Sequence, residues 1–200
     1  MDATLDVPGP VRLVRDFVNT FERQTNAESL ATPADLVRWL DDHGVPLAGL
    51  TIGASELESA RSIREGLRSV LQAHAGHDVD RDAIETLNRA LAAVPLALAF
   101  SSSATQSLVP AKSARNRAAL APVIAAVNAS QLDGTWERLK VCARDSCRWA
   151  FYDASRNRSG RWCSMAGCGN YVKMRRAYAV RTGRPVPGIP GLAEAPSPVE

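Results

Sequence analysis

Residues 142–147 read CARDSC and residues 163–168 read CSMAGC, two C-x4-C pairs that hold all four cysteines of the 200-residue chain. Thiols paired at both ends of a short loop are the ligand pattern of structural zinc sites. A fully thiolate-ligated Zn²⁺ keeps no open position, so the metal would hold a small domain together without catalysing a reaction. We therefore predict one structural zinc ion, and a disulfide pair or unliganded thiols are the alternatives. The four ligands are Cys142, Cys147, Cys163 and Cys168.

Positive charge is concentrated around these cysteines. Residues 136–184 contain twelve Lys and Arg residues against three Asp and Glu, a net charge of +9, so the remainder carries −6 within a total of +3. Four thiolates with one Zn²⁺ sum to about −2 and offset only part of this excess. Clustered charge is often only solvation, but a basic segment of this density is typical of polyanion binding.

The rest of the composition is that of an ordinary soluble protein, with 46% apolar residues. Charged residues interrupt residues 1–30, so no signal peptide is expected there, and no later segment resembles a membrane span. We expect a cytoplasmic protein without membrane contact, and a reducing compartment favours zinc over disulfides.

Apolar spacing and capping residues predict helices in the N-terminal part. Residues 11–22, 33–42, about 55–75 and about 81–93 have this pattern. Thr32 followed by Pro33 and Asp35 begins the second of these, and Ser55 with Glu58 forms an expected capping box for the third.

Two short apolar runs, 96–100 and 107–110, flank a Ser/Thr-rich stretch and predict a β-hairpin. Residues 113–129 should return to helix, with a bend at Pro122 unless the helix begins there. The expected fold class is mainly α with a small β-hairpin, followed by a small zinc-stabilised α+β module. We expect domains at 1–133 and 134–184 and a Pro-rich disordered tail at 185–200.

Within the basic segment, residues 136–142 suit a strand and residues 169–181 suit a helix. One helix face would pack on the zinc site while the opposite face presents cations to phosphates, with one or two able to reach base edges. The candidate nucleic-acid contacts are Arg156, Arg158, Arg161, Asn170, Lys173, Arg175, Arg176 and Arg181.

The segment with the four cysteines resembles the CGNR zinc finger. The residues that carry the resemblance, besides the cysteines, are Trp149, the run from Phe151 to Asn157 except Ala154, Arg161-Trp162, Gly169-Asn170 and Lys173. Residues 13–20 (LVRDFVNT), the TPADL helix start at 32–36 and Trp39-Leu40 are similar to the beginning of the ABATE domain, which precedes this finger in a family of stress-induced transcription regulators. The resemblance implies a DNA-binding zinc module and an N-terminal domain that senses a small-molecule effector or forms a homodimer. One position departs from the motif, because Tyr171 stands where the family has the Arg of Cys-Gly-Asn-Arg.

The aromatic residues of the module, Trp149, Phe151, Tyr152 and Trp162, favour a miniature core, but they could also stack on unpaired bases. Three function classes remain: a duplex-DNA regulator, an RNA or single-strand binder, and a protein-interaction adaptor. A phosphate loop, an H-E-x-x-H motif and a G-x-S-x-G motif are all missing from the sequence, so we expect no enzyme.

Overall fold

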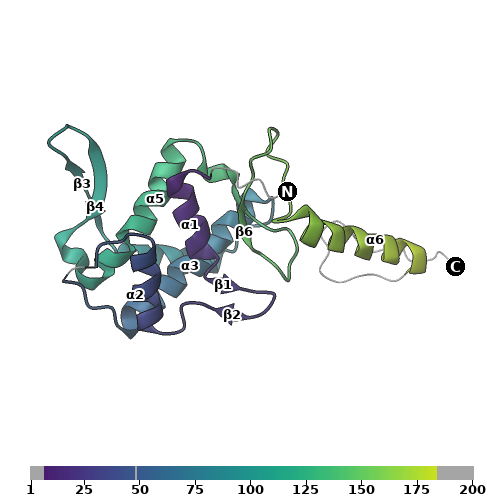
Figure 1. Ribbon diagram of the computed structural model, residues 1–200, viewed down its shortest axis with the longest axis horizontal. Coiled ribbons are helices and arrows are strands. Elements are labelled where there is room, and N and C mark those ends of the chain that lie inside the picture. The colour runs from purple at the N-terminus through teal and green to yellow at the C-terminus, as the bar shows by residue number, and fades with distance from the viewer. Residues whose placement is uncertain (1–6, 48, 184–200) are drawn as a thin grey trace.

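The structure is a computed structural model that describes residues 7–47 and 49–183 (Figure 1). The predicted tail at 185–200 lies outside the described residues. Helix α1 (Gly9–Val18) buries Val11, Val14 and Phe17 as its apolar spacing predicts. It ends four residues earlier than expected, because Phe21–Glu22 (β1) pairs with Ala27–Glu28 (β2).

Helix α2 (Pro33–Asp42) has the predicted bounds, and its capping box joins Thr32 and Asp35 in both directions. Helix α3 (Ala54–His74) begins differently from the expectation. The Glu56 carboxylate accepts from the Gly53 amide at 3.0 Å, so the cap lies two residues before the predicted pair of Ser55 and Glu58. Helix α4 (Arg81–Ala92) follows.

Strands β3 (Leu96–Phe100) and β4 (Gln106–Pro110) form the predicted hairpin, with Leu98 opposite Leu108. The chain continues through a 3₁₀ segment, η1 (Lys112–Leu120), into α5 (Ala121–Leu132). Pro122 lies in the first turn of α5, where a missing amide N–H costs nothing, so the helix begins there and needs no bend.

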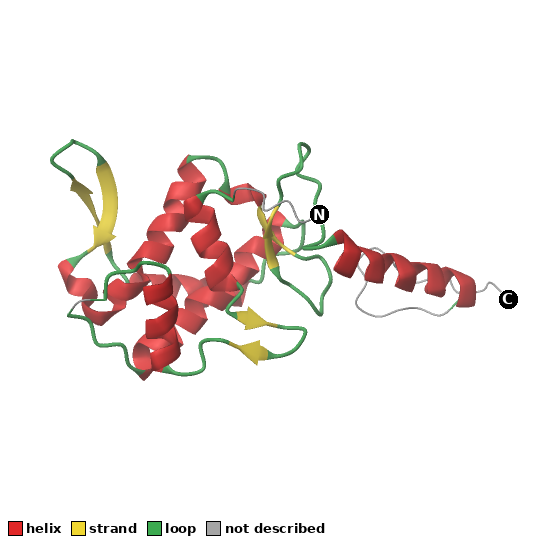
Figure 2. Cartoon of the chain, viewed as in Figure 1, coloured by secondary structure: helices red, strands yellow, loops and turns green. Residues whose placement is uncertain are grey.

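The C-terminal part starts with η2 (Trp136–Arg138), β5 (Leu139–Val141) and β6 (Ala150–Tyr152), which pair antiparallel. The predicted strand is thus shorter than 136–142. A π-turn, η3 (Met165–Gly169), leads into α6 (Asn170–Thr182). Figure 2 shows helices dominating the fold, and the strands described here form three separate two-stranded sheets, so the expected fold class is confirmed.

One hydrophobic core joins the two parts of the chain. Leu139, Val141 and Ala150 of the β5–β6 pair belong to the same buried cluster as Val14 and Leu67 of the N-terminal helices. Strand β5 packs against α3, and β6 packs against α1. The β5–β6 hairpin therefore packs on the N-terminal helices, whereas α6 extends from the body at the end opposite to β3–β4 (Figure 1).

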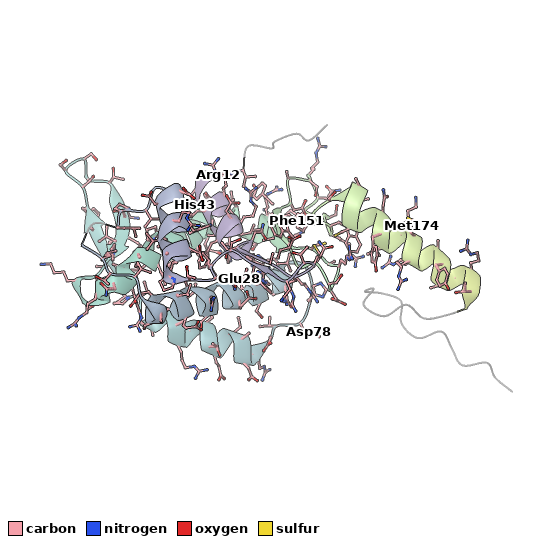
Figure 3. The ribbon with its side chains drawn as sticks, turned by 60° about the horizontal axis from the view of Figure 1, so that its bottom comes forward. Arg12, Glu28, His43, Asp78, Phe151 and Met174 are labelled. Atoms are coloured by element: carbon pink, nitrogen blue, oxygen red, sulfur yellow. The ribbon has the colours of Figure 1, made fainter. Side chains whose placement is uncertain are left out.

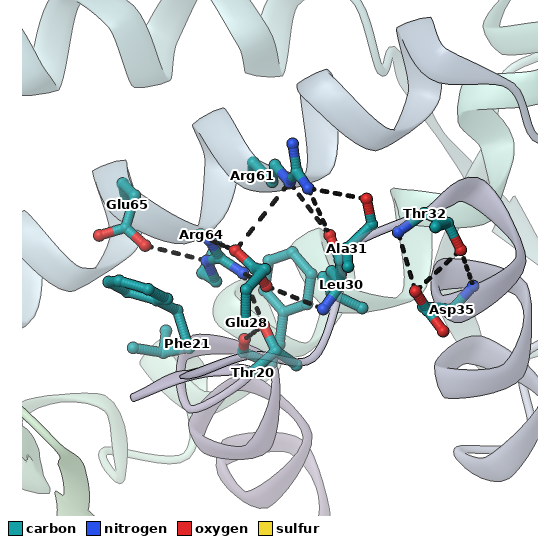
Figure 4. A network of polar contacts seen from close by, with 12 residues as sticks. Thr20, Phe21, Glu28, Leu30, Ala31, Thr32, Asp35, Arg61, Arg64 and Glu65 are labelled. Atoms are coloured by element: carbon teal, nitrogen blue, oxygen red, sulfur yellow. Dashed lines mark hydrogen bonds and ion pairs between the residues drawn. The ribbon is translucent and has the colours of Figure 1, made fainter. Parts of the chain in front are cut away.

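Helix α3 also carries buried charge that fixes the β1–β2 hairpin (Figure 4). The Arg64 guanidinium donates to both carboxylate oxygens of Glu28 at 2.7 Å and to the Thr20 hydroxyl at 3.2 Å. This bidentate pairing satisfies a guanidinium that is nearly removed from water. None of the helices in the described part of the chain is long and apolar enough to cross a membrane.

Candidate metal centre and basic surface

The four cysteine sulfurs converge in one place. All four Sγ atoms lie within 4.8 Å of one another, with Cys147–Cys163 at 3.7 Å and Cys163–Cys168 at 3.8 Å. A disulfide needs about 2.05 Å, so these cysteines are free thiols. With Zn–S bonds of about 2.3 Å, a tetrahedral site has sulfur–sulfur separations of about 3.8 Å. The cysteines thus form a site for one structural zinc ion, as the spacing predicts.

Short turns aim each pair of thiols at the site. Cys142 follows β5, where its amide donates to the Trp149 carbonyl at 2.9 Å, and the Cys147 amide closes the intervening turn on Arg144 at 2.8 Å. In the second pair, Cys163 precedes the π-turn and Cys168 lies within it, and the Ser164 hydroxyl caps the turn by accepting from the Gly167 amide at 3.2 Å. Cys168 lies two residues before α6, so a bound metal would fix the start of that helix.

Hydrogen-bond donors surround the sulfurs. The Gln24 side chain donates to Cys147 Sγ at 3.4 Å, and an Arg144 Nη donates to Cys168 Sγ at 3.9 Å. Such donors stabilise thiolate charge around a bound cation. Hydrogen bonding with the neighbouring Cys142 raises the pKa of Cys147 and that of Cys163. Zinc binding must therefore release protons from these thiols.

The N-terminal helices hold the loop between the two cysteine pairs. The Asn19 amide donates to the Ala150 carbonyl at 2.9 Å and accepts from the Ala150 N–H at 2.8 Å. Arg68 on α3, which is 1% exposed, donates to the carbonyls of Val18 and Arg148 at 2.6 and 3.0 Å. The metal centre is therefore braced by contacts that span 80 and 131 positions in sequence.

A cluster of hydrogen bonds around the Asp153 carboxylate fixes the loop after β6. The carboxylate of Asp153 accepts from Lys140 Nζ at 2.8 Å, from the Ser155 amide and hydroxyl at 3.0 and 2.6 Å, and from the Gly160 amide at 2.8 Å. Burial alone would raise the pKa of Asp153, but these donors lower it to about 2. Gly160 is required here, since an added Cβ would lie 2.7 Å from the carboxylate.

Several cations of the basic segment serve the module itself. Lys140 is buried against Asp153, and Arg138 donates to the carbonyls of Asp153 and Ser155. Arg148 pairs with Asp145 and Arg158 with Glu137. The net charge of +9 thus overstates the charge that is free to meet a partner.

The candidate nucleic-acid residues fall into two exposure groups. Seven of the eight are exposed, whereas Arg176 is half-buried on the side of α6 that also buries Val172 and Ala179. Along α6, the outward side chains include Lys173, Arg175, Arg181 and Met174, and Figure 3 shows Met174 projecting from the helix. The exposed cations of the loop before the second cysteine pair are Arg156, Arg158 and Arg161.

Tyr171, which replaces the arginine of the family motif, contacts Arg144. The Arg144 guanidinium lies 3.8 Å from the centroid of the Tyr171 ring. The same guanidinium donates to Cys168 Sγ, so it links the first cysteine loop, the second cysteine pair and the start of α6. A cation–π contact of this kind holds charge on the surface next to the zinc site.

The module's aromatic residues lie mainly inside it. Trp149 and Trp162 pack around the cysteine cluster, Trp162 also contacts Val172, and Tyr152 packs on the main core. This arrangement supports the miniature-core interpretation for these residues. The rings that face solvent are instead Tyr171 and Tyr178 on α6.

Sequence reasoning missed the residues that brace the centre: Asn19, Gln24, Arg68 and Arg144. Asn19 follows an apolar helical pattern and Gln24 lies in a polar turn, so neither carries a local signal for a contact with distant cysteines. Arg144 stands between two predicted ligands, and that placement was the one local clue to its role.

Comparison with known protein families gives two matches that together cover most of the chain. Residues 11–134 match the ABATE family, described as "Putative stress-induced transcription regulator". Residues 138–181 match the CGNR zinc finger, and this range includes all four cysteines and most of α6. A comparison with curated proteins finds no match.

Proposed function

Since the chain belongs to the ABATE family of transcription regulators and carries a CGNR zinc finger, we propose that it regulates transcription by binding duplex DNA through the zinc module. Zinc has a structural role in this proposal, because four thiolates occupy its coordination positions. Its task is to fix α6 and the preceding loops in one arrangement for binding.

The observation that carries the proposal is a group of exposed cations around the metal centre. The ion pairs found among residues 7–47 and 49–183 involve Lys140, Arg148 and Arg158 of the basic segment. None of them involves Arg156, Lys173, Arg175 or Arg181. Side chains of this kind suit phosphate oxygens, whose contacts supply most of the affinity of DNA-binding proteins.

The shape of α6 suits duplex DNA. It is 13 residues long and extends from the body, so its outward face is open along most of its length (Figure 1). The major groove is about 12 Å wide and admits an α-helix. We assign phosphate contacts to the exposed cations. Arg176 is half-buried, so it is the least suited of these residues to contact DNA directly.

The N-terminal half would supply regulation, by sensing a small-molecule effector or by joining two copies of the chain. The buried contacts from Asn19 and Arg68 to the cysteine loop give such a signal a physical route. The two halves, which meet at residues 133 and 134, would then differ in function and not in packing, because they share one hydrophobic core.

An RNA or single-strand binder is the second candidate, and exposed rings favour it. Tyr171 and Tyr178 are 40% and 39% exposed on α6, where unpaired bases could stack on them. Duplex DNA remains the first choice because these rings lie next to Arg144 and Arg181, which cover part of their faces.

The test uses the zinc-loaded full chain and fluorescence anisotropy on its own upstream DNA, in duplex and single-stranded form and as RNA. We expect duplex to bind most tightly and to compete best. Preference for single strands or RNA would favour the second candidate. An absence of binding to all three would leave the adaptor role and overturn the proposal.

A further inference from the structure

The β3–β4 hairpin presents an apolar face to solvent. Side chains alternate along a strand, and the observed register places Leu96, Leu98 and Phe100 on the same face as Gln106, Leu108 and Pro110. Leu98 is 59% exposed and Phe100 is 67% exposed. Large apolar side chains grouped on one exposed sheet face are typical of an interaction surface.

The hairpin has little support of its own. Strand β4 packs against α5, while the main neighbour of β3 among the described elements is β4 itself. A two-stranded hairpin is marginally stable in water and gains stability when its apolar face is covered. Figure 1 shows the hairpin extending from the body, so its face is accessible to another molecule.

Charge is absent from this part of the chain. No Asp, Glu, Lys, Arg or His lies between Arg89 and Lys112, although 22% of the whole chain is charged. A polyanion would find no cation here. A two-fold contact places the same patch of both copies together, and a patch without charged groups brings no like charges into that contact.

We infer that the apolar face of the β3–β4 hairpin is the contact through which two copies of this chain associate. The two faces pack against each other about a two-fold axis and remove Leu98 and Phe100 from water. The hairpin and α6 lie at opposite ends of the molecule, so such a dimer leaves both zinc modules free (Figure 1). Two free modules would suit two half-sites on DNA.

This inference develops the dimerisation named in the proposed function, but its test contains no DNA, so either can fail alone. Sedimentation equilibrium on the zinc-loaded full chain, over a wide concentration range, should show a monomer–dimer equilibrium. The variant Leu98→Ser/Phe100→Ser should stay monomeric with an unchanged zinc content and, at concentrations where the parent is monomeric, an unchanged melting temperature. The matched control is Val79→Ser/Leu132→Ser, which removes two exposed apolar side chains elsewhere and should dimerise like the parent.

Hydrogen exchange tests the same surface without any substitution. Amides of residues 96–110 should become more protected as the concentration of the parent protein rises, while those of α4 should not change. A parent protein that is monomeric throughout, or a hairpin variant that dimerises like the parent, would overturn the inference. A monomer that instead binds zwitterionic phosphatidylcholine vesicles through this face would overturn it too.

Discussion

The side-chain amide of Asn19 exchanges two hydrogen bonds with the backbone of Ala150, 131 residues further along the chain. Asn19 caps the C-terminal end of α1, and Ala150 begins the strand that follows the first cysteine pair. The side-chain amide of Asn19 therefore pairs with both backbone groups of Ala150, as the backbone of a neighbouring strand would. Through it, the end of an N-terminal helix sets the position of the loop that carries Cys147.

Replacing Asn19 with alanine should lower the free energy of unfolding of the zinc-loaded chain by about 2 kcal/mol, because both Ala150 backbone groups lose their partner. Chemical denaturation measures this change. The control is Asn88→Ala on the exposed side of α4, which should cost much less. Equal effects of the two substitutions would mean that the contact with Ala150 contributes nothing.

The four sulfurs predict one equivalent of zinc per chain in elemental analysis. Cys163→Ser should lose that metal, because three thiolates cannot complete the tetrahedral site. Since β5 and β6 share a core with α1 and α3, the loss should also lower the melting temperature of the N-terminal helices.

The matched control for this prediction is Ser146→Ala, which changes the loop of the first cysteine pair without removing a ligand. It should keep the zinc and melt like the parent. Purified parent protein with disulfides and no metal would contradict the site, and helices that melt unchanged after zinc loss would contradict the shared core.

Asp153→Asn should destabilise the chain by about 3–5 kcal/mol, because it leaves the ammonium of Lys140 buried without a counter-charge. Asp145→Asn is the control, since it removes a carboxylate of the same module whose pair with Arg148 is more exposed. That substitution should cost less than about 1 kcal/mol. The two variants are compared by urea denaturation at neutral pH.

The same carboxylate predicts a pH dependence. Its pKa is lowered to about 2 from an ordinary value near 3.8, so its stabilising effect is complete above about pH 4 and declines as the pH falls toward 2. The stability difference between the parent and Asp153→Asn should therefore be constant from pH 8 to pH 5. A difference that declines within that range would show that Asp153 titrates well above the stated pKa.

Local signals in the sequence predict most helices and the metal centre. Thr32 and Asp35 set the start of α2 through a contact three residues apart, and the cysteine spacing specifies the ligands directly. Errors arise where two local signals compete. Glu56 and Glu58 are both suited to cap α3, and only the structure shows that Glu56 does so.

Contacts between distant residues leave no such local signal. Arg68 occupies a helical position where a charge would normally face solvent, yet it is buried and bonded to carbonyls from two other segments. Counting charges likewise could not separate Lys140, which is buried in an ion pair, from Lys173, which is exposed. Sequence reasoning therefore found the basic segment but not the subset of cations that is free.

The most direct test of DNA binding by the zinc module is the salt dependence of affinity for the variant Lys173→Ala/Arg175→Ala/Arg181→Ala. If each cation contacts one phosphate, the slope of log affinity against log salt should fall by about three units, on specific and scrambled duplexes alike. The control variant, Arg81→Ala/Arg89→Ala/Lys112→Ala, removes the same charge from exposed positions of the N-terminal half and should keep the parent slope. Parent-like slopes for the α6 variant, or equal losses in both variants, would contradict the account.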